Sequence, residues 1–199
     1  MAFTVTDFKA NLKQGVARPS LFSVELLFPS AIANPPSPGI SNFLVKGTTI
    51  PASTVGAFDV FYHGKAVKVA GDRTYDTWET TIINDEDFSI RIALEQWMDL
   101  IADHRLNIRR KLSKKEGENA SYKQRLKLTQ WTKTGVEAWH YHFLGAFPTA
   151  LSTIALDWGT ASEIEEYTVT WSYDRWMPGG LVPDPRSDVP HLFPDETHR

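Results

Sequence analysis

The stretch Val69–Ile101, VAGDRTYDTWETTIINDEDFSIRIALEQWMDLI, changes its pattern halfway along. Apolar and β-branched residues recur with period two in Asp76–Asn84, which is typical of a strand with one buried face. From residue 87 onward the apolar residues fall at helical spacing, so that one face of a helix could be buried. They are Ile90, Ala93, Leu94, Trp97 and Ile101. The stretch therefore predicts a strand followed by a helix over about residues 87–104.

Acidic residues gather around this strand and helix. Asp72 and Asp76 flank Arg73 at a predicted turn into the strand, a spacing that suits turn hydrogen bonds and ion pairing. Asp85 and its neighbours precede the helix, where carboxylates cap free N–H groups and meet the positive end of the helix dipole. Paired carboxylates that act as acid and base would need a pocket and a substrate, which no pattern here indicates. We interpret the acidic residues as structural, and we expect no enzymatic activity from them.

The same period-two pattern recurs along most of the chain. Eight or nine predicted strands in about 160 residues indicate a mainly β fold, a two-sheet β-sandwich or barrel with the helix flanking it. A short run, 152–158, is ambiguous, and a second short helix is predicted over 7–13. The predicted strands are 20–28, 42–50, 56–63, 65–70, 76–84, 122–131, 136–144 and 165–176.

Two proline-rich stretches interrupt the pattern. Pro29–Gly39 carries four prolines in eleven residues, which predicts a loop between strands. Met177–Arg199 has five prolines and two glycines and no apolar periodicity, which is typical of an arm or tail. We expect a β domain over residues 1–176, with a Pro-rich loop at 29–39 and a basic loop at 105–125, and an extension over 177–199.

Composition excludes several classes of protein. The chain has 199 residues, 42% of them hydrophobic, and these values are globular. Because there is no cysteine, disulfides, thiol nucleophiles and thiolate metal sites are excluded. No apolar run approaches the roughly 18 to 20 residues of a membrane span, and the first residues lack a signal-peptide core. We expect a protein made and kept in a cytosol-like compartment.

The net charge of −3 conceals a basic run. Residues 105–125 hold eight Lys or Arg and two Glu, a net +6, which leaves −9 on the remainder. Such a run could bind nucleic acid, but Tyr122 is its one aromatic residue, so stacking on bases has little support. The other interpretation is a solvated or partner-facing loop. The candidate contact residues in it are Arg109, Arg110, Lys114 and Lys115.

His140 and His142 would project from one face of a strand. A His-x-His pair can bind a metal in a cupin barrel. That pattern needs a carboxylate a few residues later, and here the next one is Asp157. The alternative is two histidines on one sheet face without a metal, and we expect neither metal nor cofactor.

Four segments together resemble a known family. They are ARPSLFSVEL (17–26), VAGDRTYDTWETTIINDED (69–87), FPTALSTIALDW (147–158) and EIEEYTVTWSYDRW (163–176). In this order and spacing they are similar to the tail tube proteins of contractile-tailed, T-even-type bacteriophages. The motif residues that carry the resemblance are Asp72, Arg73, Asp76, Trp78, Asp85, Trp158 and Trp176. The segment after Trp176 lies beyond the family pattern, and the 29–39 loop is longer than usual.

The resemblance implies a structural virion protein. Members form hexameric rings that stack into the inner tube of a contractile tail, inside a sheath and between baseplate and terminator proteins, and phage DNA passes through the lumen without specific binding. It implies a location in the virion tail after assembly in the host bacterial cytoplasm.

Other functions stay open from the sequence. A baseplate tube initiator, a tail terminator or a secretion-system tube protein would share the fold. A small-ligand barrel or cupin-like metalloenzyme would use His140 and His142.

Overall fold

The computed structural model describes residues 16–37, 39–108, 122–160 and 162–179, together with Val5 and Ala10. This part of the chain is mainly β, as predicted, with one principal helix. Its elements are β1 (Phe22–Leu26), α2 (Ser41–Leu44), β2 (Val45–Thr48), β3 (Thr54–Tyr62), β4 (Lys65–Thr74), β5 (Trp78–Ile83), α3 (Ser89–Ile101), β6 (Gln124–Trp131), β7 (Glu137–Leu151), β8 (Glu166–Ser172) and β9 (Arg175–Pro178).

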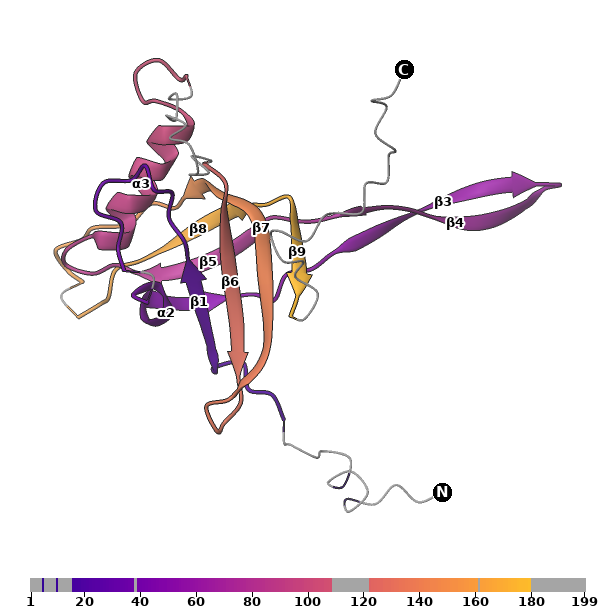
Figure 1. The fold of residues 1–199 in the computed structure, drawn as a ribbon, viewed down its shortest axis with the longest axis horizontal. Helices are drawn as coiled ribbons and strands as arrows, with labels where there is room; N and C mark the ends of the chain where they lie inside the picture. The colour runs from indigo at the N-terminus through magenta and orange to yellow at the C-terminus, as the bar shows by residue number, and fades with distance from the viewer. Residues whose placement is uncertain are drawn as a thin grey trace, which may run out of the picture.

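One long strand, β7, joins the two halves of the main sheet. The strand order is β1-β6-β7-β8-β5-β2, and β9 also pairs with β7. The register between β6 and β7 shifts at Leu144 and Gly145, which have no partner on β6. Gly145 has a φ of 67°, a conformation that suits glycine. Because this bulge bends β7, the strands of the two halves cross and enclose the core (Figure 1).

The core is filled by alternate residues of the facing strands. On β5, Trp78, Thr80 and Ile82 point inward, and Tyr167, Val169 and Trp171 do the same on β8. The Trp78 ring stacks on Phe143 of β7, with centroids 4.1 Å apart. The buried Trp171 Nε1–H donates to Thr80 Oγ1 at 2.9 Å, so both polar groups are satisfied inside the core.

Helix α3 packs on this core through the face that the spacing predicted. Ile90, Ala93, Leu94, Trp97 and Leu100 are buried. The Trp97 ring lies edge-on to Trp171, and its Nε1–H donates to the Tyr122 carbonyl at 2.7 Å. The helix begins at Ser89, two residues later than predicted, because Phe88 has a left-handed φ of 51°. It ends where Ala102 becomes extended.

Three segments differ from the predicted strands. Residues 41–44 form a short helix instead of the start of a strand, and Ser41 Oγ accepts the Leu26 N–H across from it. The run 165–176 is two strands, because the chain breaks at Tyr173 and Asp174 to pass from one half of the sheet to the other. The ambiguous run 152–158 holds no strand. The predicted helix at 7–13 lies outside the described residues except for Ala10.

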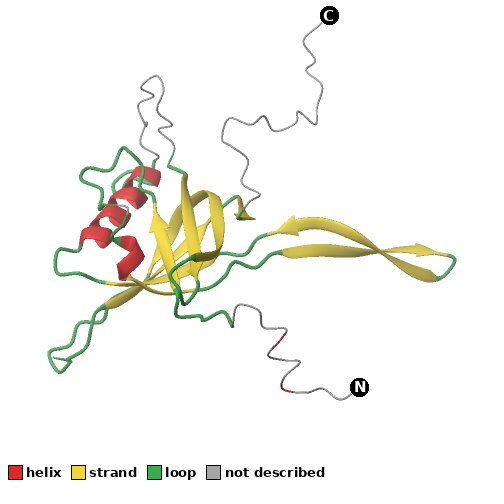
Figure 2. Ribbon diagram, turned by 60° about the horizontal axis from the view of Figure 1, so that its bottom comes forward, coloured by secondary structure: helices red, strands yellow, loops and turns green. Residues whose placement is uncertain are grey.

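The hairpin β3–β4 forms a separate two-stranded sheet. It projects from the body as a long twisted ribbon (Figure 2). Among the helices of the described residues, none is long and apolar enough to cross a membrane.

Candidate assembly surfaces

The hairpin β3–β4 has an apolar face made by cross-strand pairs. Phe58 pairs with Val69, Val60 with Val67 and Tyr62 with Lys65, and these pairs alternate with pairs of the other face. On that other face Asp59 and Lys68 form an ion pair of 2.9 Å. We call Phe58, Val60, Tyr62, Val67 and Val69 the hairpin apolar face.

The turn of the hairpin suits its sequence. His63 and Gly64 both have positive φ, 46° and 78°, as a two-residue turn between twisted strands requires. The two strands follow the predicted runs 56–63 and 65–70, and pairing continues beyond the second run to Thr54 and Thr74. The sequence therefore predicted the strands, but it gave no sign that they stand apart from the core.

The hairpin lacks a core of its own. Every residue of β3 is exposed, and the Phe61 and Tyr62 side chains are 73% and 71% accessible. A two-stranded hairpin alone is marginally stable in water, because it has no third strand or helix to bury its side chains. Contiguous exposed apolar side chains on a folded protein mark an interaction site. The hairpin apolar face is thus a surface that a partner would cover.

The motif residues Asp72 and Arg73 lie on this hairpin. The prediction that they form a turn is wrong, because Arg73 lies in β4, where it pairs with Val55 of β3, and β4 continues to Thr74. Asp76 follows in the link to β5. Within the described residues, no side-chain hydrogen bond or ion pair joins Asp72, Arg73 and Asp76. Their predicted ion pairing is therefore absent from this part of the structure, and they lie where the ribbon leaves the body.

Trp78 and Asp85 have structural roles. Trp78 is 1% exposed and its Nε1–H donates to the Thr49 carbonyl at 2.8 Å, which fixes β5 against the end of β2. Asp85 accepts from the Ser89 N–H at 2.9 Å and from the Ser89 hydroxyl at 2.6 Å. Asp85 thus satisfies one free N–H of the first turn, as predicted for an acidic residue here, although the N-cap position itself is Phe88, which makes no side-chain capping hydrogen bond.

Open edges remain in both sheets of the described residues. An uninterrupted apolar strand such as 136–144 could serve as an adhesive edge, but β7 pairs with β6 on one side and with β8 and β9 on the other. Among the described residues, the edge strands of the main sheet are β1, β2 and β9. An apolar groove of about 400 Å³ lies beside β1 and β2, lined by Phe22 of β1, by Ile50 just after β2, and by Leu128 and Tyr141.

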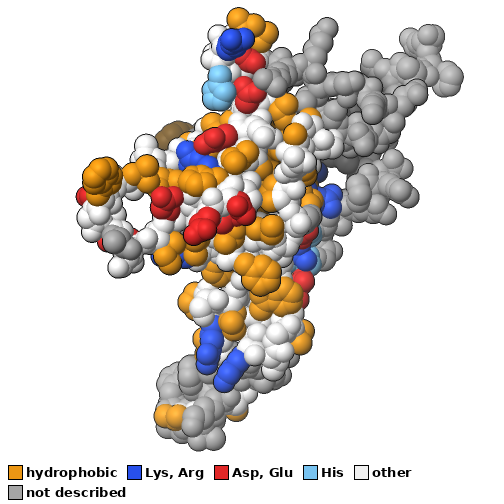
Figure 3. Space-filling view, turned by 90° about the vertical axis from the view of Figure 1, so that its left-hand side faces the viewer, with side chains coloured by type: hydrophobic (Ala, Val, Ile, Leu, Met, Phe, Trp, Pro, Cys, Tyr) orange, Lys and Arg blue, Asp and Glu red, His pale blue; other side chains and the backbone are white. Residues whose placement is uncertain are grey.

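A second groove lies where the loop after β7 approaches the start of α3. It has a volume of about 770 Å³ and is lined by residues of 154–166, with Asp87, Phe88 and Ile92 of the helix start close to it. Trp158 is fully exposed and Leu156 is 81% exposed. Acidic and apolar side chains intermingle on this side of the molecule (Figure 3). We call it the acidic groove.

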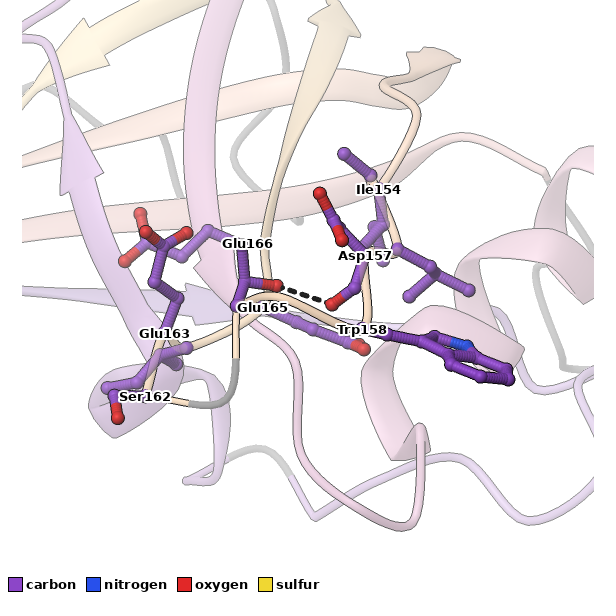
Figure 4. A pocket seen from close by; sticks show the side chains of 11 residues that line it. Ile154, Asp157, Trp158, Ser162, Glu163, Glu165 and Glu166 are labelled. Atoms are coloured by element: carbon purple, nitrogen blue, oxygen red, sulfur yellow. Dashed lines mark hydrogen bonds between the residues drawn. The ribbon is translucent and has the colours of Figure 1, made fainter.

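Carboxylates outnumber cations along the acidic groove. Asp157, Glu163 and Glu166 surround its hollow, and the Trp158 ring projects away from them (Figure 4). Glu166 pairs with Lys46, and Glu95 pairs with Arg91. Within the described part of the chain, no ion pair neutralises the remaining acids. They are Asp87, Asp157, Glu163 and Glu165.

The two histidines share one face of β7, with ring centroids 4.9 Å apart. His140 Nδ1 contacts the Glu137 carboxylate. Burial, helped by the nearby positive charges of His140, Arg125 and Lys127, lowers the pKa of His142 to about 4. Among the described residues, no group of three or more His, Asp or Glu side chains could hold a metal ion. The pair is thus packed within the sheet, and the absence of a metal stays a prediction.

The remaining candidate residues lie at the margins of the described structure. Arg109, Arg110, Lys114 and Lys115 lie outside the described residues. The predicted basic loop overlaps β6, which begins at Gln124. Trp176 donates to the Ala52 carbonyl at 3.0 Å and lies in β9, which continues to Pro178. The role of the 177–199 extension stays a prediction.

Comparison with known proteins agrees with this architecture. A family model described as phage tail tube protein matches residues 17–178. The tail tube protein gp19 of Enterobacteria phage T4 is 29% identical over 161 residues, which cover 80% of this chain and 90% of the T4 protein. The gp19 protein of Enterobacteria phage T6 has the same identity and coverage.

Solved structures show the same fold at lower identity. The tube-terminating cap of the anti-feeding prophage has a TM-score of 0.58 and 14% identity, and the match covers 83% of this chain and 91% of the cap chain. A chain of the anti-feeding prophage baseplate has a TM-score of 0.55 and 11% identity, with 82% and 95% covered. These two matches show the fold alone. Since the family match extends over most of the chain, from before β1 to the end of β9, the chain belongs to the phage tail tube protein family.

Proposed function

We propose that this chain forms the wall of the inner tube of a contractile phage tail, as hexameric rings stacked along one axis. The hairpin β3–β4 is the observation that carries the proposal. A ribbon whose aromatic and β-branched side chains are exposed, with no packing partner among the described residues, suits burial against a neighbouring subunit. A contact between two different surfaces of identical subunits closes into a ring when the rotation permits, and stacking of rings extends it. The number six rests on the family resemblance.

Tube function also fits the charge distribution. Residues outside 105–125 carry a net −9, and a wall without excess positive charge would let DNA slide instead of holding it. The tail sheath would surround the tube, and baseplate and terminator proteins would meet its ends. The rings would assemble in the host cytoplasm and remain in the virion tail. No enzymatic step is needed for this role.

The alternatives of the same fold differ in copy number. A baseplate initiator or a terminator would form a single ring, and a secretion-system tube protein would work outside a phage. The 29% identity to the T4 and T6 tail tube proteins favours the tube body over these.

Negative-stain electron microscopy of the purified chain at high concentration tests the proposal, combined with mass measurement after cross-linking. Class averages viewed down the axis should show six-fold rings, and longer incubation should give stacks. A chain that stays monomeric at high concentration, or rings of another symmetry, would contradict it. Rings that never stack would favour the initiator or terminator function.

A further inference from the structure

The start of α3 lies at an acidic surface, and the chain after the end of α3 enters a basic run of sequence. At the start of the helix lies the acidic groove, with the carboxylates of Asp87, Asp157, Glu163 and Glu165, which form no ion pair within the described residues. Two of them accept a hydrogen bond, Glu165 from the Asn84 amide and Asp157 from the Gly159 N–H. At its other end the chain enters the basic run 105–125, with a net charge of +6. Two described residues of that run are held close to the helix, because the Trp97 Nε1–H donates to the Tyr122 carbonyl and the Asn107 N–H donates to the carbonyl of Asp103, just after the helix.

Both surfaces also expose apolar side chains. Leu156, Trp158 and Ile164 are exposed at the acidic groove. Leu106 and Ile108 are exposed at the start of the basic run. Among the described residues, a fully exposed tryptophan beside carboxylates without an ion pair suits a partner that is both apolar and basic, because aromatic anchors supply contact area and complementary charges set the register.

We propose that the acidic groove binds the basic run 105–125 of a second copy of this chain, in the next ring of the tube. The 13 residues of α3, at 1.5 Å per residue, set the start of the helix about 20 Å from its end, beyond which the chain enters the basic run. Because the acidic groove lies at the start of this helix and the basic run follows its end, each copy offers one to the copy before it and the other to the copy after it. Such a contact is heterologous and extends along an axis. The proposal rests on the proposed tube function and names the contact between its rings.

Charge reversal in the acidic groove is the first arm of the test. Asp87→Lys with Glu163→Lys reverses two exposed carboxylates that have no ion pair within the described residues. We expect rings to form normally and the critical concentration for tubes to rise about 5- to 30-fold, as the loss of two surface charge contacts and the new repulsion would give. Glu79→Lys with Glu86→Lys makes the same change of net charge outside the groove and should leave that concentration unchanged.

A charge swap is the second arm. Arg109→Glu with Arg110→Glu should impair tubes in the same way, and the combination of these two with the two groove reversals should restore them. Trp158→Ala should impair tubes without changing the melting temperature of the monomer, because its side chain is fully exposed among the described residues. Salt should weaken the wild-type contact and have less effect on the Trp158 contribution.

The outcomes separate this contact from the tube function itself. A wild-type chain that forms no rings or tubes refutes both. Wild-type tubes together with normal tubes from the groove variant refute this contact alone. A swap that fails to restore tubes also overturns it. If the groove variant lowers the melting temperature of the monomer and tubes are unaffected, the basic run docks on its own chain and the inference is wrong.

Discussion

Replacing Val60 and Val67 of the hairpin apolar face by threonine should impair assembly and leave the folded monomer intact. The two side chains form a cross-strand pair, and each is about half exposed, at 46% and 51%. Threonine is β-branched like valine, so the strands keep their local preference for extended structure. The substitutions therefore act on the hairpin apolar face, which a neighbouring subunit would bury in the assembled state.

The expected magnitude follows from this exposure. Complete burial of a valine side chain contributes about 1.5 kcal/mol, so burial of the remaining half of two valines contributes about 1.5 kcal/mol in all. Each buried threonine hydroxyl without a hydrogen-bond partner costs roughly a further 1 kcal/mol or more. Because about 1.4 kcal/mol corresponds to a factor of ten, the concentration needed for assembly should rise at least about 100-fold.

Sedimentation velocity over a concentration series, with negative-stain images of the same samples, measures this shift. Asp59→Asn with Lys68→Gln is the matched control, since it removes an exposed ion pair from the other face of the same hairpin. Exposed ion pairs contribute about 0–1 kcal/mol, so the control should assemble nearly as the wild type does. Assembly of the valine variant at wild-type concentration, or an equal loss in the control, would refute the role of the hairpin apolar face.

Three further predictions concern the body of the subunit. Thr80→Val leaves the buried Trp171 Nε1–H without an acceptor and should lower the free energy of unfolding, measured by urea titration, by about 1–3 kcal/mol. Thr81 faces away from the core, so Thr81→Val should change this free energy by less than about 0.5 kcal/mol. Asp85→Ala removes the acceptor of the Ser89 N–H and should cost about 1 kcal/mol, and equal destabilisation by Asp87→Ala would contradict the capping role. Burial lowers the pKa of His142 from 6.5 to about 4, so as pH falls the unfolded chain binds a proton before the folded chain does. The stability that His142 contributes is therefore complete above pH 6.5 and is lost as pH falls toward 4. His142→Gln should make the melting temperature depend less on pH over this window than in the wild type, and parallel profiles of the two proteins would contradict this.

Local patterns in the sequence determined much of this protein. The period-two runs located the strands, and the helical spacing of Ile90, Leu94 and Trp97 located the buried face of α3. These predictions succeed because a residue's side of a strand or helix depends only on its distance along the chain. The motif residues also indicated the family, and the family match confirms it.

Other features depend on pairing between distant residues, and only the tertiary structure decided them. The sequence did not show that β7 bends at Gly145 and joins both halves of the sheet, or that Asp72 and Arg73 lie within a strand, because register is set by the partner strand. The acidic groove brings the start of α3 next to the loop around Trp158, which lies about 70 residues further along the chain.

The hairpin β3–β4 shows the sharpest limit. Its runs 56–63 and 65–70 have the apolar pattern of core strands, yet their side chains are exposed in the single chain. Water is excluded from an interface between subunits much as it is from a core, so both favour the same residues. The apolar pattern around Phe58 and Val60 indicates burial, and only the tertiary structure shows that the described part of their own chain leaves them exposed.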